Sequence, residues 1–457
     1  MMNLAAAAQA LGARIERGDS RFESVSTDSR TLEPGALFVA LRGERFDGHE
    51  YLAVAKERGA VAAMIEPAGA DRCTKVGLAA LVVNDTRRAL GDLARHWRAR
   101  FTIPLIAIVG SNGKTTVKEM IAACLRAHFG AAHVLATAGN LNNDIGVPLT
   151  LLRLRAAHRV AVVELGMNHP GETAYLATIA RPTIGVVNNA QREHQEFMKS
   201  VADVAAEHAV LLAALPPDGI AVINADDDHA TTWRAAAGAR VVRDFGVAAG
   251  AAVRATRRPA DTATALEIVT PEGRSTVVLQ VAGLHNVRNA LAAAAAATAA
   301  GASLESVAEG LAGFRAVKGR LQQRGGRNGT ALIDDTYNAN PDSVRAAIDV
   351  LSRATGTRVM VLGDMGELGV QGVDFHAEVG RHARDVGVTR LFTIGQLAQH
   401  AASAFGVGAV HLDSLEALLA ALEPMIVPGT TVLVKGSRFM RMERVVERIV
   451  EETAECC

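Results

Sequence analysis

Residues 106–117 constrain the fold more than any other stretch of the chain, because they read Ile-Ala-Ile-Val-Gly-Ser-Asn-Gly-Lys-Thr-Thr-Val. The apolar run predicts a buried parallel strand, the glycines predict a tight turn, and the periodicity of residues 117–129 predicts a helix. The unpaired N–H groups at such a helix start, together with the helix dipole, attract anions. The Lys114 amine can reach a terminal phosphate, and the Thr115 hydroxyl suits Mg²⁺. We therefore predict a nucleoside triphosphate site that contains Gly110, Ser111, Asn112, Gly113, Lys114, Thr115 and Thr116.

The spacing of this loop differs from the usual phosphate-loop pattern. That pattern has a glycine where this chain has Ile108. A match to so short a pattern also arises by chance, but the predicted strand and helix on either side favour a true phosphate site.

The composition is that of a globular protein with several domains. The 457 residues suffice for about three domains, 49% of them are apolar, and the formal net charge is zero. A neutral chain gives no electrostatic reason to expect nucleic-acid binding. No stretch approaches the ~20 apolar residues of a membrane span, and the alanine-rich residues 3–11 lack the basic flank of a signal peptide. We therefore expect neither a nucleic-acid nor a membrane partner.

The cysteines indicate a reducing compartment. Cys73, Cys124, Cys456 and Cys457 are too few and too scattered for a disulfide framework or a zinc site. We therefore expect a cytoplasmic protein.

Apolar strands that alternate with helical stretches predict an α/β fold with three domains, at residues 1–85, 86–320 and 321–457. In the second domain, strands are expected at residues 106–109, 160–163, 184–187 and 220–223, and the alanine tract 291–300 is expected to be helical. In the third domain, strands are expected at residues 331–333, 359–362, 391–394 and 432–434. This alternation is typical of doubly wound parallel sheets, whose ligands bind at the carboxyl ends of the strands.

Two predicted strands of the second domain end in residues that can hold a metal. Residues 160–163 lead into Glu164, and a buried carboxylate there is unfavourable without a charged partner or a metal. Residues 184–187 lead into a polar run that ends at His194. Either side chain can also be a hydrogen-bonded structural residue, so both alternatives stay open at this point.

Amide and carboxylate side chains mark further candidates. Asn286 and Asn289 share a helix face and can pair with a purine edge, although Asn286 can equally cap the helix. In the third domain, the strand-end residues 334–341 can hold a ribose and stack on a base, although Asp334 can equally cap the turn. Residues 363–369 and 435–438 also follow strands, so several polar loops of this domain can close on one ligand.

These motifs together resemble those of the Mur ligases, the ATP-dependent amide-forming enzymes of peptidoglycan assembly, over essentially the full chain. The shared motifs are residues 110–116, Glu164, His194, Asn286 with Asn289, residues 319–320 and residues 335–340. Residues 27–30, 34–41, 139–143 and 363–369 resemble the branch that joins D-alanyl-D-alanine to UDP-N-acetylmuramoyl-tripeptide. Sister ligases that add diaminopimelate often have an Asp-Asn-Pro-Arg motif, but residues 338–342 read Asn-Ala-Asn-Pro-Asp here.

The resemblance implies a central P-loop ATPase domain with a parallel sheet, flanked by an N-terminal UDP-binding α/β domain and a C-terminal Rossmann-like α/β domain. It implies Lys114, Glu164 and His194 as catalytic residues and ATP and Mg²⁺ as cofactors. Of the metal ligands that it implies, Thr115 and Glu164 bind one Mg²⁺ and His194 binds a second. It also implies that Asn286 and Asn289 face adenine. The residues implied to close over the nucleotide are Arg320, Asp335 and Tyr337. The residues implied to bind the other substrates are Ser29, Arg30, Asp47, His49, Asn140, Asn143, Asn340, Asp364 and Glu367.

The activity that the resemblance implies is ligation through an acyl phosphate, in the synthesis of cytoplasmic peptidoglycan precursors for cell wall biogenesis, cell shape and cell division. We expect a monomer whose tripeptide substrate has either diaminopimelate or lysine at its third position. One alternative is a sister ligase of the Mur or folylpolyglutamate type that uses another amine. A different alternative is a nucleotide-binding regulatory module without ligase activity.

One departure from the family concerns the second metal. Mur ligases often have a carbamylated lysine that bridges two metals, but His208 occupies that place here, and Lys199 lies too early in the chain. Glu207, water, or a weaker second Mg²⁺ site can account for the difference. We hypothesise that Glu207 or water supplies the missing oxygen, and we expect activity that does not depend on bicarbonate.

Overall fold

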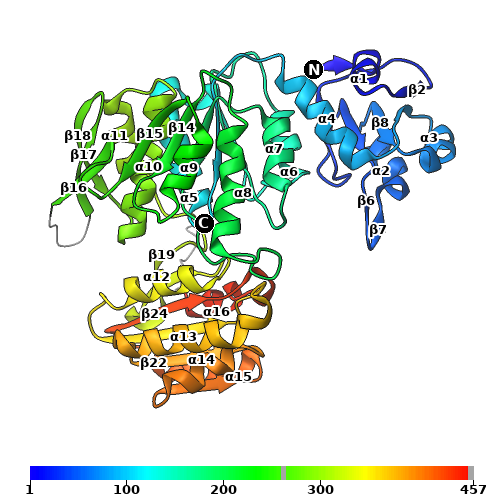
Figure 1. Cartoon of the computed structure of the whole chain (residues 1–457). Helices are drawn as coiled ribbons and strands as arrows, with labels where there is room; N and C mark the ends of the chain where they lie inside the picture. Colours follow the sequence, from blue (N-terminus) through cyan, green and yellow to red (C-terminus); the bar gives the residue numbers. More distant parts are fainter. Residues whose placement is uncertain (259–263, 451–457) are drawn as a thin grey trace, which may run out of the picture.

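The computed structural model describes residues 1–258 and 264–450 and contains three α/β units in chain order (Figure 1). The N-terminal unit, in blue, and the C-terminal unit, in yellow to red, lie on different sides of the central unit. The predicted three-domain α/β architecture is therefore confirmed.

The N-terminal unit is built on a five-stranded sheet with helices on both faces. In spatial order, its strands are β2 (Arg14–Glu16), β9 (Ala79–Val82), β8 (Ala62–Ile65), β5 (Ala36–Val39) and β4 (Ser24–Ser26). Alternate residues of β5 pack in different cores. Phe38 packs with α2 (Leu52–Glu57) and α3 (Ala70–Val76), whereas Leu37 shares a core with α1 (Leu4–Leu11). Two short antiparallel pairs complete the unit, β1 (Met2–Asn3) with β3 (Arg21–Phe22) and β6 (Arg42–Gly43) with β7 (Phe46–Asp47).

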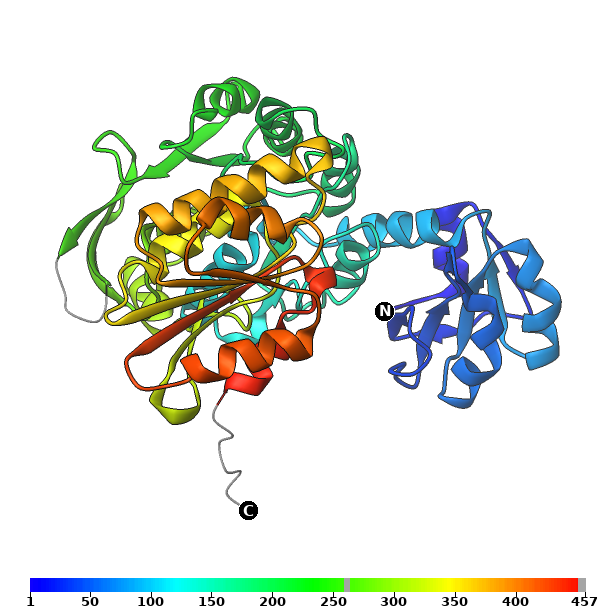
Figure 2. The same ribbon diagram turned by 90° about the horizontal axis from the view of Figure 1, so that it is seen from below.

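Helix α4 (Thr86–Arg98) connects the N-terminal unit to the central unit (Figure 2). The Asp85 carboxylate caps it by accepting hydrogen bonds from the N–H groups of Arg87 and Arg88, at 2.8 and 3.0 Å. Its apolar face packs in one continuous core with residues of both units, and the Trp97 indole donates to the Leu154 carbonyl at 3.1 Å. The N-terminal unit is therefore anchored by a packed helix, and the boundary predicted after residue 85 lies at the start of that helix.

The central unit contains a nine-stranded sheet. In spatial order, its strands are β11 (Val134–Ala136), β12 (Val160–Glu164), β10 (Leu105–Val109), β13 (Ile184–Val187), β14 (Ile220–Asn224), β15 (Val241–Gly246), β16 (Val253–Arg258), β17 (Thr264–Thr270) and β18 (Gly273–Leu279). The strands from β11 to β16 are parallel, and β17 and β18 continue the sheet antiparallel. The four strands predicted in this domain are thus confirmed, whereas the antiparallel end of the sheet was not predicted.

Helices cover both faces of the central sheet, because its strand residues alternate between two cores. On one face, Ala107 and Val163 share a core with α6 (Gly146–Leu151), α7 (Glu172–Ala180), α8 (Val201–Ala213) and α9 (Ala230–Ala237). On the other face, Ile106 and Val162 pack with α5 (Lys114–Phe129), α10 (Leu284–Ala299) and α11 (Leu304–Gly313). The predicted helix after the phosphate loop and the predicted alanine helix correspond to α5 and α10.

The C-terminal unit has a six-stranded sheet. In spatial order, its strands are β19 (Gln322–Gly325), β20 (Ala331–Asp335), β24 (Thr430–Lys435), β21 (Thr357–Gly363), β22 (Arg390–Ile394) and β23 (Ala409–Leu412), and only β19 is antiparallel to its neighbour. Helices α12 (Pro341–Leu351), α13 (Gly372–Asp385) and α14 (Ala398–Phe405) cover one face, and α15 (Leu415–Leu422) and α16 (Glu443–Ile449) cover the other. The four strands predicted in this domain are confirmed.

The structure also bears on the expectations about membranes and cysteines. No helix within residues 1–258 and 264–450 has the length and apolar character needed to cross a bilayer. Cys73 and Cys124 are buried free thiols, and Cys456 and Cys457 lie outside the described residues.

Candidate active site

A cleft of about 1480 Å³ opens between the central and C-terminal units. Its central-unit wall is formed by the segments that follow β10, β12, β13 and β14, together with the start of α10. The C-terminal unit contributes the segments that follow β20, β21 and β24. The cleft therefore lies at the carboxyl ends of both parallel sheets, where α/β proteins bind their ligands.

The predicted phosphate loop lies on this cleft, except that Gly110 sits beneath it. Helix α5 starts directly after Gly113, whose φ of 80° is in the left-handed region, and a Cβ there would lie 2.7 Å from Asn289 Oδ1. Glycine is therefore required at this position. The Asn188 side chain supports the loop by donating to the Asn112 carbonyl at 2.8 Å. The loop thus presents the N-terminus of α5 to the cleft, which is the arrangement that binds phosphates.

Lys114 lies within the mouth of this loop. Its Nζ donates to the Gly110 carbonyl and to the Ser111 carbonyl, the latter at 3.3 Å, and lies 3.4 Å from the Glu193 carboxylate. The side chain is mostly buried. These acceptors hold the ammonium group next to the N-terminus of α5, where it can meet a phosphate.

Thr115 and Glu164 meet on the floor of the cleft. The Thr115 hydroxyl donates to Glu164 Oε2 at 2.8 Å, and Asn142 Nδ2 donates to Glu164 Oε1, also at 2.8 Å. A hydroxyl and a carboxylate are hard oxygen donors, so this pair fits Mg²⁺. No group of three His, Cys, Asp or Glu side chains poised to hold a metal occurs among the residues that the structure describes. A cation here would therefore take phosphate and water as its other ligands, as Mg²⁺ commonly does.

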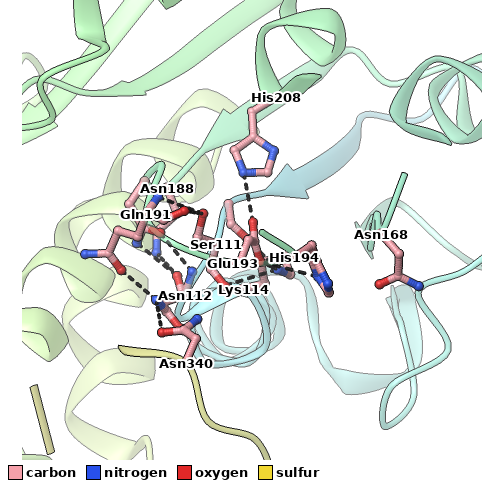
Figure 3. A network of polar contacts seen from close by, with 12 residues as sticks. Ser111, Asn112, Lys114, Asn168, Asn188, Gln191, Glu193, His194, His208 and Asn340 are labelled. Atoms are coloured by element: carbon pink, nitrogen blue, oxygen red, sulfur yellow. Dashed lines mark hydrogen bonds and ion pairs between the residues drawn. The ribbon is translucent and has the colours of Figure 1, made fainter. Parts of the chain in front are cut away.

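The polar loop that follows β13 brings His194 to the same cleft (Figure 3). His194 has a φ of 49°, which is uncommon for a residue other than glycine, and its Nδ1 is hydrogen-bonded to the Glu367 carboxylate of the C-terminal unit. That hydrogen bond holds the pKa of Glu367 below its usual value. The contact fixes the ring so that Nε2 faces into the cleft, 3.7 Å from Glu193.

Glu193 was not predicted as a site residue, yet it lies at the centre of this cluster. Its side chain contacts Lys114, His194 and His208, as Figure 3 shows. Burial alone would raise the pKa of Glu193, but Lys114 and the two histidines outweigh burial and lower it to about 2. The carboxylate is therefore charged at neutral pH.

The structure does not support Glu207 as the ligand that compensates for His208. Its two carboxylate oxygens accept hydrogen bonds from the N–H groups of Gly171 and Thr173, at 3.0 and 2.8 Å. Glu207 therefore caps the N-terminus of α7 and does not line the cleft. The sequence does not distinguish this cap from a metal ligand, because both need a carboxylate.

The two asparagines of α10 are buried side by side at the cleft. Asn289 Nδ2 donates to Asn286 Oδ1 at 3.3 Å, and Asn188 Nδ2 donates to Asn289 Oδ1 at 3.2 Å. Gly283 is the N-cap of α10 and no side chain caps it, so Asn286 is not the cap. The structure thus places a paired amide surface beside the phosphate loop.

Arg320, at the predicted boundary between the second and third domains, lines the cleft together with Asp335 and Tyr337 of the C-terminal unit. The Arg320 guanidinium lies 4.0 Å from the centre of the Tyr337 ring and donates to Thr115 Oγ1 at 2.9 Å. Asp335 accepts from Lys435 Nζ at 2.5 Å. Asp334, by contrast, accepts from the Thr336 hydroxyl and caps the turn, which was the alternative left open for it.

Asn340 and Glu367 also reach the cleft, where each joins the two units. Asn340 Nδ2 donates to Asn112 Oδ1 at 3.0 Å, and its Oδ1 caps α12. Arg192 adds an ion-pair contact, because its guanidinium binds both Asp342 and Glu378 of the C-terminal unit. These contacts hold the two walls of the cleft together.

Of the other three predicted substrate residues outside the N-terminal unit, only one lines the cleft. Asn143 lines the cleft, but Asn140 and Asp364 do not. Asp364 Oδ1 accepts from the N–H groups of Leu397 and Ala398, at 3.0 and 2.7 Å, so it caps α14. A capping carboxylate at a strand end looks the same in sequence as a ligand-binding one, which is why the prediction placed Asp364 at the substrate.

Ser29, Arg30, Asp47 and His49 belong to the N-terminal unit, away from the residues that line the cleft. His49 is buried, its Nδ1 contacts Asp47 Oδ1 at 2.5 Å, and its Nε2 accepts from the Glu66 N–H at 3.0 Å. Arg30 is exposed and paired with Asp28. The pair of Asp47 and His49 thus shapes the loop around the β6–β7 hairpin.

Sequence reasoning did not single out Asn188, Arg192, Glu193 or Lys435 as site residues. Asn188, Arg192 and Glu193 follow the end of β13, and Lys435 is the last residue of β24, so the rule that identified Glu164 also covers them. What sequence patterns do not show is which of several polar residues in one loop points inward.

Comparison with known proteins agrees with this geometry. Residues 21–98, 108–297 and 319–438 match the families described as Mur ligase family, catalytic domain; Mur ligase middle domain; and Mur ligase, glutamate ligase domain. The chain is 41% identical to the UDP-N-acetylmuramoyl-tripeptide–D-alanyl-D-alanine ligase of Escherichia coli (strain K12), over 98% of this chain and 97% of that protein. It is similar to a crystal structure of MurF from Acinetobacter baumannii, with a TM-score of 0.89, 35% identity and 98% coverage of each chain. It is also similar to MurF ligase from Thermotoga maritima in complex with ADP, with a TM-score of 0.80, 26% identity and coverage of 93% of this chain and 96% of that one.

Proposed function

This chain belongs to the Mur ligase family, and we propose that it is the ATP-dependent ligase that joins D-alanyl-D-alanine to UDP-N-acetylmuramoyl-tripeptide. The observation that carries this proposal is the cleft in which the phosphate loop and Glu164 face Arg320 and Tyr337. A full-length relative with the same named activity supports the choice of substrates.

The reaction needs an activated acid, because amide formation from a free carboxylate is unfavourable. The terminal carboxylate of the tripeptide attacks the γ-phosphorus of ATP, so that an acyl phosphate forms and ADP leaves. The amine of D-alanyl-D-alanine then attacks the acyl carbon, and the tetrahedral intermediate collapses with release of phosphate. One bond to phosphorus and one bond to carbon are thus exchanged, the attacking amine gives up one proton to solvent or a base, and the products are the amide, ADP and phosphate.

Charge on the transferred phosphoryl group has to be stabilised, and positioning and electrostatics do most of this work in phosphoryl transfer. We propose that the ammonium group of Lys114 meets the γ-phosphate at the N-terminus of α5. Mg²⁺ bound at Thr115 and Glu164 would neutralise further phosphate charge. Arg320 on the ring of Tyr337 would close the nucleotide site from the C-terminal unit.

The same proposal assigns the remaining parts of the chain. Asn286 and Asn289 would face adenine, and the N-terminal unit would hold the UDP end of the tripeptide near Ser29, Arg30, Asp47 and His49. Asn140, Asn143, Asn340 and Glu367 would lie near the peptide and the amine. We keep the domain bounds 1–85, 86–320 and 321–457 as part of this proposal, with Arg320 at the junction of the second and third domains.

We further propose a cytoplasmic monomer that acts in cell wall biogenesis and thereby in cell shape and cell division. ATP and UDP-linked precursors are cytoplasmic metabolites, which supports this location. Neither nucleic acid nor membrane is expected as a partner.

Release of phosphate with different substrate pairs tests the proposal. We expect release only when ATP, UDP-N-acetylmuramoyl-tripeptide and D-alanyl-D-alanine are all present. Release with a free amino acid in place of the dipeptide would show a sister ligase. ATP binding without release under any of these conditions would show a module that does not ligate.

A further inference from the structure

Glu193 and His208 form a buried pair whose role the reaction described above leaves unassigned. Glu193 is 5% exposed and His208 is 1% exposed. His208 Nε2 lies 3.3 Å from Glu193 Oε1, but the geometry is not that of a hydrogen bond. Within the described residues, Glu193 Oε1 and both ring nitrogens of His208 therefore lack a hydrogen-bond partner.

An ion pair with a purely structural role would normally give Glu193 Oε1 and the ring nitrogens of His208 hydrogen-bond partners. Buried charges and polar groups in proteins are normally satisfied by close partners, because they lose the hydrogen bonds of water. The contacts of Glu193 with Lys114, His194 and His208 measure 3.4, 3.7 and 3.3 Å, and all are long for charged hydrogen bonds. The carboxylate thus keeps free acceptor capacity: its unpaired Oε1 faces His208, and its Oε2, which accepts one long hydrogen bond from Lys114, faces His194 at the cleft.

The requirements on Glu193 change when a phosphate is present. The Lys114 ammonium group lies 3.4 Å from Glu193, and the proposed function turns this amine toward the γ-phosphate. Glu193 then needs another positive charge beside it, because an uncompensated buried carboxylate is strongly unfavourable.

His194 is oriented to bind a metal ion, and that ion would supply the positive charge that Glu193 needs. Its Nδ1 is hydrogen-bonded to the Glu367 carboxylate. A carboxylate on one ring nitrogen fixes the ring and leaves the other nitrogen to bind a metal, as is common at metal sites. His194 Nε2 is 3.7 Å from Glu193 Oε2. Adjacent ligands of an octahedral Mg²⁺ at about 2.1 Å lie about 3 Å apart, so a small rotation brings both atoms into range.

The resemblance to Mur ligases already implies His194 at a second metal, and we infer that Glu193, held in place by His208, supplies the carboxylate ligand of that second divalent-cation site beside the pair Thr115 and Glu164. His208 is the positioning residue, and Glu193 is the ligand. The Glu193 carboxylate would then take the place of the carbamate that a modified lysine supplies in other Mur ligases. This inference rests on the proposed function, which places a triphosphate in the cleft.

Counting bound Mn²⁺ by electron paramagnetic resonance tests the inference on the full chain with a non-hydrolysable ATP analogue. The wild-type protein should bind two Mn²⁺ ions per chain. Glu193→Gln should bind one as before and the other at least about tenfold more weakly. His208→Gln should keep two ions but bind the second more weakly, because the carboxylate remains and only its support is lost.

Glu196→Gln is the matched control, since Glu196 is an exposed acid of the same loop and its replacement removes the same charge. It should bind two ions like the wild type. Thermal unfolding and affinity for the analogue in the absence of metal report whether each variant is folded. If Glu193→Gln does not fold, Glu193→Asp takes its place and should weaken the second ion.

Two outcomes would overturn the inference. One is a wild-type protein that binds a single Mn²⁺, and the other is Glu193→Gln with two ions of unchanged affinity. Phosphate release by the same wild-type preparation, which requires both other substrates, is measured alongside. It separates a failure of the inference from a failure of the proposed function.

Discussion

Arg192 offers a direct way to test how the two walls of the cleft are held together. The residue lies in the loop after β13, and its guanidinium donates to Asp342 at 2.6 Å and to Glu378 at 2.7 Å, both in the C-terminal unit. It also packs 5.1 Å from the centre of the Phe375 ring. Replacing Arg192 with methionine keeps an apolar stem of similar length and removes both ion pairs. We expect this variant to open the cleft.

The size of the effect follows from the geometry. Arg192 and Asp342 are each 22% exposed, and Glu378 is 30% exposed, so the pairs are neither fully screened nor fully buried. Exposed ion pairs contribute about 0.2–1 kcal/mol and hydrogen bonds to charged groups about 1.5–3 kcal/mol. We therefore assign about 1 kcal/mol to each carboxylate. The total of about 2 kcal/mol lowers the ratio of closed to open molecules about 30-fold.

Calorimetric titration with ADP measures this change, because the nucleotide touches residues of both units under the proposed function. Opening reduces the fraction of molecules that can bind, so Arg192→Met should weaken ADP binding by up to about 30-fold. Small-angle X-ray scattering of the ligand-free protein should show a larger radius of gyration. High salt should shift the wild-type protein in the same direction, since salt screens the pairs.

Arg345→Met is the matched control. Arg345 lies in α12 and pairs with Glu378 in α13 at 3.1 Å, so this change removes an ion pair of the same carboxylate within one unit. It should leave both the scattering and the ADP affinity as in the wild type. Equal effects of the two variants, or no effect of Arg192→Met, would show that the ion pairs of Arg192 do not hold the cleft closed.

Three further predictions concern separate features. Glu207→Ala should lower the free energy of unfolding by about 1–2 kcal/mol through loss of the α7 cap, as urea unfolding would show; a loss of ADP affinity with unchanged stability would contradict this. Burial keeps the pKa of His376 below its usual 6.5, so the stability it contributes is present above that pH and is lost as the pH falls. His376→Asn should therefore show a flatter loss of stability between pH 7 and pH 5, and parallel curves for both proteins would exclude this role. Finally, phosphate release should be the same with and without bicarbonate, because a histidine at position 208 forms no stable carbamate; inhibition on removal of bicarbonate would contradict this.

Contiguous features of the chain were predicted well. The phosphate loop could be located because its strand, turn and helix follow one another directly, and each has its own pattern. Glu164 and His194 followed from one rule about the ends of parallel strands. The structure places all of them at one cleft.

Contacts between distant segments could not be predicted in the same way. Lys435 and Asp335 are 100 residues apart and meet only because β20 and β24 are neighbours in the sheet. The direction of a side chain within a loop is equally hidden, so Asp364 and Glu207 looked like ligands although they cap helices. The strands β16 to β18 alternate buried residues, such as Leu266 and Ile268, with more accessible ones, and therefore lack the continuous apolar runs that revealed the inner strands of the sheet.

His208, which stands where related ligases often have a lysine, shows what the sequence can predict and what needs the structure. The sequence reveals the departure, and hypotheses about Glu207 or water followed from its neighbours along the chain. The structure shows that Glu193, from the preceding loop, faces His208 instead. Glu193 and His208 meet because α8 packs beside the loop that follows β13.

The most direct test of the account is the rate of phosphate release with UDP-N-acetylmuramoyl-tripeptide and a panel of amines. We expect release with D-alanyl-D-alanine that requires the tripeptide, and none with single amino acids. Release with a single amino acid, and not with the dipeptide, would contradict it.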